Sequence, residues 1–188
     1  MKIVAILGSP KKKGNTARVL SLFEKKLQGE HELEIIHVAR QHVGGCLGCY
    51  QCQGNKAEPG CVQQDDADAI FAKMMEADAI IYATPLYCWS FSGQLKPLID
   101  RHFCLVTGYG TLDHKSLIGD KPAALLVTCA GPIERNCDVI QEIFKGFCEY
   151  GKLEAKGNFI LPFTSTPDAI GANGEEVAEN LALALIGS

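Results

Sequence analysis

The stretch KIVAILGSPKKKGNT, residues 2–16, decides how the chain is expected to fold. It opens with a short apolar run that ends at Gly8, which is typical of a buried parallel strand. A loop of turn-forming residues follows, and a helix is expected to begin at Asn15 or Thr16, because apolar side chains then recur along one face. The stretch therefore predicts a strand, a loop and a helix, which together form the repeating unit of a parallel α/β sheet.

The same alternation of apolar strands and amphipathic helices recurs along the whole chain. Strands are expected at residues 2–7, 32–38, 78–85, 121–129 and 152–161. Helices are expected from 15 or 16 to 29, from 65 or 66 to 76, and over 92–103, 133–150 and 174–186, with an irregular connection at 105–120. Five alternations predict a parallel sheet with helices on both faces. Right-handed crossovers leave few topologies, and five strands suit the flavodoxin-like order 2-1-3-4-5.

Composition limits the classes of protein to be considered. The chain has 188 residues, 47% of them hydrophobic and 21% charged, and a net charge of −4. We expect one domain over 1–188, with a cysteine-loop insertion at 44–61 and a C-terminal extension at 160–188. No nucleic-acid partner is expected, since the only basic tract is three lysines long. No membrane span and no signal peptide are recognisable, so we predict a cytoplasmic protein.

The loop at residues 8–16 has the groups that bind a phosphate monoester. In a parallel sheet of this order, ligands bind beyond the carboxyl ends of the strands, where this loop is expected. It offers hydroxyls at Ser9 and Thr16, an amide at Asn15, and backbone N–H groups at a helix N-terminus. Gly14 allows the backbone to turn close to a ligand, and three lysines add positive charge. The spacing is not that of a Walker loop, and a surface turn with solvated lysines is the alternative.

A second loop, TPLYCWSF, follows the third expected strand. Pro85 ends the strand, and Tyr87 and Trp89 place two aromatic rings where a planar ligand would lie beside the phosphate site. A flavin ring needs such apolar, stacking surfaces. The alternative is that both rings cap the core. The loop TCAGPIE, residues 128–134, is expected to line the same cleft.

Four of the nine cysteines form a compact cluster with the spacing C-x2-C-x2-C-x8-C. Three closely spaced thiolates in a glycine-rich loop suit a cuboidal iron–sulfur cluster. A zinc site, free thiols, and a reversible disulfide such as Cys46–Cys49 or Cys49–Cys52 are the alternatives. The other five cysteines lie in apolar segments and are expected to be small buried residues: Cys88, Cys104, Cys129, Cys137 and Cys148.

The segments GSPKKKGNT, ATPLY, LKPLIDR and the cysteine loop with the following DDADAI resemble the NADPH-dependent FMN reductase branch of flavodoxin-like proteins. Within that branch they are most similar to the iron–sulfur flavoproteins, over about residues 1–130. The resemblance implies FMN, with its phosphate held at Ser9, Lys11, Asn15, Thr16 and Ala17. It implies that the isoalloxazine is contacted by Pro85, Leu86, Tyr87, Cys88 and Trp89. It implies a [4Fe–4S] cluster on Cys46, Cys49, Cys52 and Cys61, although the last gap is longer than is usual there.

The resemblance also implies an activity. We expect an FMN-dependent oxidoreductase that passes electrons from NAD(P)H or a ferredoxin-like donor to a small or protein acceptor, with the cluster as a relay. No side chain is expected to act as catalytic acid or base, because the flavin carries the chemistry. A homodimer or homotetramer is expected. The alternatives are an electron carrier without a substrate of its own and a redox sensor based on the cysteine loop.

Overall fold

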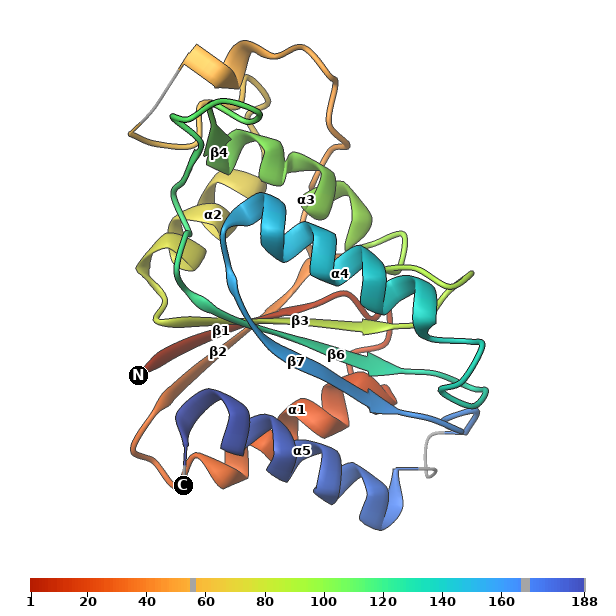
Figure 1. The fold of residues 1–188 in the computed structure, drawn as a ribbon. Coiled ribbons are helices and arrows are strands. Elements are labelled where there is room, and N and C mark those ends of the chain that lie inside the picture. Colours follow the sequence, from red (N-terminus) through yellow and green to blue (C-terminus); the bar gives the residue numbers. More distant parts are fainter. Residues whose placement is uncertain (55–56, 167–169, 188) are drawn as a thin grey trace.

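A computed structural model describes residues 1–54, 57–166 and 170–187 of the chain. Its main sheet has five strands in the order β2-β1-β3-β6-β7, and every neighbouring pair is parallel (Figure 1). The strands are β1 (Lys2–Leu7), β2 (Glu32–His37), β3 (Ala79–Pro85), β6 (Pro122–Thr128) and β7 (Glu154–Leu161). This is the predicted order 2-1-3-4-5, so the flavodoxin-like fold is confirmed.

Helices cover both faces of the sheet (Figure 1). One face carries α1 (Asn15–Lys26) and α5 (Gly171–Ile186), and the other carries α2 (Ala67–Glu76), α3 (Lys96–Arg101) and α4 (Asp138–Gly151). The sheet thus has an apolar core on each face, and strand β1 contributes side chains to both cores. Its Ile3 and Leu7 pack in the core under α1 and α5, whereas Val4 and Ile6 pack in the other. Alternate side chains of a strand point to opposite faces, so a centrally placed parallel strand must be apolar throughout.

The structure moves the starts of three expected helices by three residues or more. The helix expected over 92–103 begins at Lys96, after a turn, and continues as the short 3-10 helix η3 (His102–Leu105). A proline at its first turn suits this late start, since the missing N–H would have no partner there. The helix expected at 133 begins at Asp138, because residues 133–137 form turns. The helix expected at 174 already begins at Gly171.

The connection at 105–120 is irregular, as expected, apart from one small antiparallel pair. Strand β4 (Val106–Thr107) pairs there with β5 (Lys115–Ser116). Two short 3-10 helices, η1 (Val38–Arg40) and η2 (Gln51–Gly54), flank the first part of the cysteine loop. Residues 55–56 of that expected insertion, and 167–169 and 188 of the expected C-terminal extension, lie outside the described residues. Among the described helices, none is long and apolar enough to cross a membrane.

Candidate functional site

A pocket of about 210 Å³ lies beyond the carboxyl ends of β1, β3 and β6, and we name it the strand-end pocket. It is lined by Ser9, Lys11, Gly14, Asn15, Thr16, Pro85, Leu86, Tyr87, Thr128, Cys129, Ala130, Thr164 and Ser165. The loops after β1 and β3 thus meet where the sequence placed the ligand. Of the predicted cofactor residues, Ala17, Cys88 and Trp89 are not part of this lining. Thr164 and Ser165 were missed although their loop, PFTST, carries hydroxyls and an aromatic ring, because residues 160–188 were expected to form a C-terminal extension.

The N-terminus of α1 opens at this pocket without a side-chain cap. Gly14 occupies the N-cap position and makes no side-chain hydrogen bond there. A Cβ at Gly14 would lie 3.1 Å from the Cβ of Lys11 and 3.2 Å from Oγ of Ser9, so the turn is tight. The first N–H groups of a helix have no intrahelical partner and favour an anion. The described residues therefore fit a phosphate group at this helix end.

Two buried hydroxyls join the loop after β1 to the end of β6. Oγ1 of Thr16 lies 2.7 Å from Oγ1 of Thr128, and both side chains are buried. Ser9 is also buried, and its hydroxyl accepts a hydrogen bond from the N–H of Lys11 at 3.2 Å. These bonds hold the loop in one conformation, which lowers the entropy that a ligand must remove.

Asn15 was expected to offer its amide to a ligand, but its amide nitrogen is already bonded within the protein. Its Nδ2 donates to the carbonyl oxygens of Thr164, at 2.9 Å, and Thr166, at 3.0 Å. The amide donors therefore attach the loop after β7 to α1. The Oδ1 atom of Asn15 is buried and has no hydrogen-bond partner among the described residues. An unpartnered buried acceptor is costly, so this atom suits a ligand that brings a hydroxyl donor.

The aromatic loop after β3 is a tight two-residue hairpin. Tyr87 and Ser90 exchange both backbone hydrogen bonds, at 3.3 and 3.1 Å. Between them, Cys88 and Trp89 have positive φ angles of 47° and 62°. Turns of this kind favour Asn and Gly, and a non-glycine residue held there costs about 1–3 kcal/mol. The hairpin thus stores strain beside the strand-end pocket, which is common at functional sites.

The hairpin corrects one prediction from the sequence. Cys88 was expected to be a small buried residue, and it is exposed. Its place at the tip of the turn explains this, because the tip projects beyond the end of β3. Tyr87 and Trp89 are also exposed, at 46% and 57%, so neither ring caps the core. The other four scattered cysteines are buried as expected.

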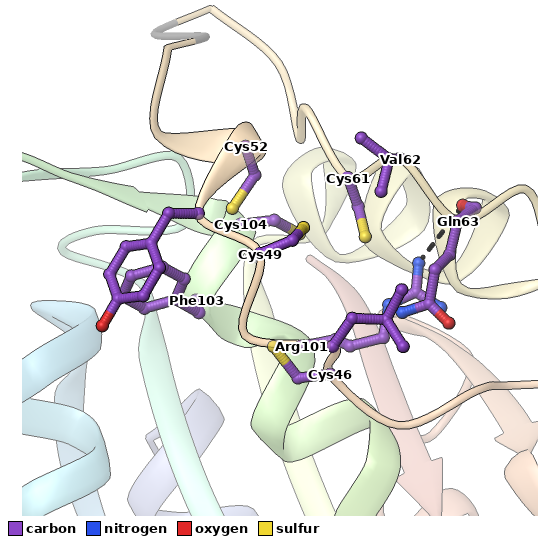
Figure 2. A pocket seen from close by; sticks show the side chains of 11 residues that line it. Cys46, Cys49, Cys52, Cys61, Val62, Gln63, Arg101, Phe103 and Cys104 are labelled. Carbon is purple, nitrogen blue, oxygen red and sulfur yellow. Dashed lines mark hydrogen bonds between the residues drawn. The ribbon is translucent and has the colours of Figure 1, made fainter.

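A second pocket is bordered by the cysteine loop, and we name it the cysteine pocket. Cys46, Cys49, Cys52 and Cys61 all line it, together with Arg101, Phe103 and Cys104 from the end of α3 and from η3. Figure 2 shows these cysteines around one space, with Arg101 at its edge. Burial raises the pKa of Cys104 to about 12. The proximity of this fifth thiol to the other four was not predicted, since it lies far from them in the sequence.

The thiols are arranged around a shared space and not around one point. Among the described residues, which include all nine cysteines, no group of three or more His, Cys, Asp or Glu side chains is placed to hold a metal ion. A zinc site needs four ligands at about 2.3 Å from one centre. In a [4Fe–4S] cluster each thiolate binds a different iron, so the sulfurs must surround a volume. The four loop thiols border one pocket, but its volume of about 20 Å³ is small for four irons and four sulfides, so the loop would have to open to hold a cluster.

A buried ion pair fastens the cysteine loop at its base. Nη1 of Arg101 donates to Oδ1 of Asp65 at 2.6 Å, and both side chains are buried. The same carboxylate accepts hydrogen bonds from the N–H groups of Gly44, at 2.8 Å, and Ala67, at 3.0 Å. Burial alone would raise the pKa of Asp65, but the bonds from Arg101, Gly44 and Ala67 lower it. Asp65 therefore holds the start of the loop, the start of α2 and the end of α3 together.

Comparisons with known proteins place the chain in one family. The family of NADPH-dependent FMN reductases matches residues 1–141. The chain belongs to this family. An iron–sulfur flavoprotein of Archaeoglobus fulgidus is 36% identical over 132 residues, which are 70% of this chain and 56% of that protein. One of Methanocaldococcus jannaschii is 39% identical over 110 residues, or 58% of this chain and 55% of that protein. The chain thus spans about half the length of these curated relatives.

Solved structures share the fold of this family member at low sequence identity. An NAD(P)H:quinone oxidoreductase from Methanothermobacter marburgensis has a TM-score of 0.71 and 17% identity, covering 97% of this chain and 95% of that one. An FMN-dependent NADH-azoreductase from Bacillus anthracis, in complex with FMN, has a TM-score of 0.67 and 16% identity, covering 97% and 100%. These two structures support the flavodoxin-like fold.

Proposed function

We propose that the protein is an FMN-dependent oxidoreductase and that FMN binds in the strand-end pocket. The observation that carries the proposal is the uncapped N-terminus of α1, which opens at the carboxyl ends of the strands. This is the place where sheets of this kind bind their ligands. Membership of the NADPH-dependent FMN reductase family supports FMN as the cofactor and NAD(P)H as the electron donor.

We propose that different residues at the strand-end pocket bind the phosphate, the ribityl chain and the ring of FMN. The phosphate would lie on the first N–H groups of α1, including that of Ala17, with the hydroxyls of Ser9 and Thr16 and the charge of Lys11 nearby. A hydroxyl of the ribityl chain would donate to the unpartnered Oδ1 of Asn15. The ring would lie along the loop after β3, which carries Pro85, Leu86, Tyr87, Cys88 and Trp89.

When bound, FMN supplies the transfer of electrons, and the chain binds and orients it. The exposed hairpin tip would cover one edge of the ring while a nicotinamide or an acceptor approaches from solvent. We propose no catalytic acid or base among the predicted site residues. The acceptor is proposed to be a small oxidised molecule, such as a quinone, or a protein.

We further propose that Cys46, Cys49, Cys52 and Cys61 hold a [4Fe–4S] cluster. The support is that all four border the cysteine pocket and that relatives of the chain are named iron–sulfur flavoproteins. The buried guanidinium of Arg101 lines the same pocket, and its Nε has no partner among the described residues. Such a cation would balance the negative charge of four thiolates.

Helix α3 connects the two proposed redox sites. The hairpin of the strand-end pocket precedes α3, and Arg101 at its end lines the cysteine pocket. A relay from a ferredoxin-like donor through the cluster to FMN would run along this helix or across to a second copy of the chain. A homodimer or homotetramer stays a prediction, as does the cytoplasmic location, and the mass of the purified protein in solution tests the first.

Purification without oxygen tests both cofactors. We expect flavin absorbance with one FMN per chain, together with iron and acid-labile sulfide near four each per chain. Cys49→Ser should abolish iron and sulfide and keep FMN, whereas Cys148→Ser, at a buried cysteine outside both pockets, should keep all three. Full FMN without iron in the unmodified chain would contradict the cluster, and a chain without FMN would contradict the oxidoreductase.

Steady-state oxidation of NAD(P)H separates the enzyme from the two alternatives. Turnover with a soluble quinone alone supports the enzyme. Activity that requires an added redox protein supports an electron carrier. A redox sensor would instead show thiol oxidation in the cysteine loop that follows the flavin state without turnover, and mass spectrometry of the loop thiols would detect it.

A further inference from the structure

We propose that Cys129 and Cys137 form a dithiol that exchanges two electrons with the flavin of the strand-end pocket. Their Sγ atoms lie 3.5 Å apart, and both residues are buried. Neither belongs to the cysteine loop, and the sequence predicted only small buried residues at both positions. The proposal rests on the proposed FMN site for its electron acceptor and adds a second redox group beside it.

The backbone on both sides of the pair is held in place. The N–H of Cys129 donates to the carbonyl of Leu161 at 3.0 Å, and its own carbonyl accepts from Oγ1 of Thr164 at 3.0 Å. The N–H of Cys137 donates to the carbonyl of Ile133 at 2.8 Å. A disulfide has an S–S distance of about 2.05 Å, so the two sulfurs, now 3.5 Å apart, must approach each other for the bond to form.

The location of the pair links it to the strand-end pocket. Cys129 directly follows β6 and lines the pocket beside Thr128 and Ala130. Cys137 is the residue before the first turn of α4, at its N-cap position. A helix N-terminus favours a thiolate, and reactive dithiols are found at such positions. The pair therefore combines access to the flavin on one side with a helix end on the other.

Burial protects the pair from incidental oxidation. It raises the pKa of Cys129 to about 12 and also raises that of Cys137, where the hydrogen bond from Cys129 opposes the effect. A protonated thiol reacts slowly with soluble oxidants. An acceptor already bound in the adjoining pocket has the advantage of proximity.

The exchange balances without a further reactant. Two S–H bonds break and one S–S bond forms. The two electrons reduce oxidised FMN, which takes up one proton as its reduced anion, while the second proton goes to solvent. In the opposite direction, reduced FMN returns two electrons to the disulfide, and two protons restore the thiols. Each chain can then store two electrons in addition to those on its flavin.

A reductive titration of FMN-loaded protein tests this capacity. The holoprotein is first oxidised with excess free FMN without oxygen, desalted and titrated with dithionite. We expect the unmodified chain to consume two electrons per chain more than Cys137→Ser or Cys129→Ser. Cys148→Ser, the matched control at a buried cysteine with no place in the pair, should consume as many as the unmodified chain. Any cluster contributes equally to all four proteins.

Peptide mapping gives a direct readout on the unmodified chain. Cleavage after Arg135 places the two cysteines on separate tryptic peptides, residues 116–135 and 136–145, since Pro122 blocks cleavage after Lys121. In the FMN-oxidised protein we expect these peptides to be linked by a disulfide, and after dithionite we expect both thiols to be alkylated. The linkage should be absent from both pair variants.

The outcomes separate this inference from the proposed function. Bound FMN with both thiols free after oxidation, and with equal electron consumption in all four proteins, would overturn the dithiol alone. A protein that holds no FMN, but whose pair is oxidised by added FMN, would overturn the strand-end pocket as the flavin site and keep the dithiol. If both pair variants fail to fold, peptide mapping of the unmodified chain still decides between a disulfide and two thiols.

Discussion

The strand-end pocket and the cysteine pocket are fastened by different means. The first lies where four loops leave neighbouring strands of one parallel sheet, and buried hydroxyls such as those of Thr16 and Thr128 join two of these loops. The second is bordered by a loop that leaves the edge strand β2 and is fastened at its base by Asp65 and Arg101. The strand-end pocket therefore depends on the fold as a whole, whereas the cysteine pocket depends on contacts local to one loop, which include this ion pair and the hydrogen bonds from Gln53 to the carbonyls of Phe103 and Val106.

This difference implies that one pocket can lose its structure while the other keeps it. The bonds that shape the strand-end pocket are spread over many residues, so single changes there should act mainly through ligand contacts. At the cysteine pocket one carboxylate accepts hydrogen bonds from three donors, so losing it or its arginine should release the base of the loop. The following changes test this contrast in order of decreasing expected effect.

Arg101→Met should have the largest effect, because it leaves the carboxylate of Asp65 buried without its cation. Breaking one side of a buried pair costs about 3–5 kcal/mol of unfolding free energy. We expect iron binding to be lost, hydrogen exchange of the cysteine loop to rise, and FMN to be retained under mild conditions. Lys96→Met, which breaks an exposed pair with Asp100 in the same helix, is the matched control and should cost at most about 1 kcal/mol. Equal losses of iron and FMN in Arg101→Met would contradict the contrast.

Acid should destabilise the fold through His102, which begins η3 beside the cysteine pocket. Burial lowers the pKa of His102 to about 4 from 6.5, so between these values the unfolded chain binds a proton that the folded chain does not. Stability should therefore fall as the pH decreases from about 6.5 to 4, by roughly 3 kcal/mol from this group. Urea unfolding at several pH values measures the slope. His102→Gln should flatten it, and His31→Gln, at a histidine outside both pockets, should not.

Gly14→Ala should weaken FMN binding about tenfold and leave iron unchanged. The new Cβ would lie 3.1–3.2 Å from Lys11 and Ser9, so the turn must open and the phosphate contacts shift. A tenfold change corresponds to about 1.4 kcal/mol. Fluorescence quenching of free FMN measures the affinity. Gly146→Ala is the control, because its Cβ would meet no atom within 4 Å. Unchanged FMN affinity in Gly14→Ala would place the phosphate elsewhere.

Trp89→Gly should have the smallest effect and the opposite sign. Glycine adopts the φ of 62° at this position without strain, so we expect thermal stability of the FMN-free protein to rise by about 1 kcal/mol. Trp89→Ala keeps a Cβ and hence the strain, so it should not be stabilised. If Trp89 contacts the ring as predicted, both variants should change the flavin spectrum of the holoprotein and neither should alter its iron content.

The fold was predictable because its signals are local and repeated. Each strand carries its own apolar run, and each helix its own periodicity, so the strand order followed from five such units and the handedness of crossovers. The starts of α3 and α4 were misplaced, since polar and turn residues before them can also begin a helix. Ser9, Thr16 and Tyr87 were placed in the pocket from strand ends alone, because all carboxyl ends of a parallel sheet meet at one edge.

The sequence by itself determined the order of the sheet, the place of the strand-end pocket and the clustering of four cysteines. Only the tertiary structure decided that Cys104 joins the loop cysteines, that Cys129 and Cys137 meet, and that Asn15 gives its amide to Thr164. It also decided that Arg101 and Asp65 share one buried contact. The physical reason is that these contacts join side chains whose approach depends on how loops and helices pack. Hydrophobic periodicity specifies which face of an element is buried, but it carries no information about which polar or thiol group the neighbouring element brings to that face.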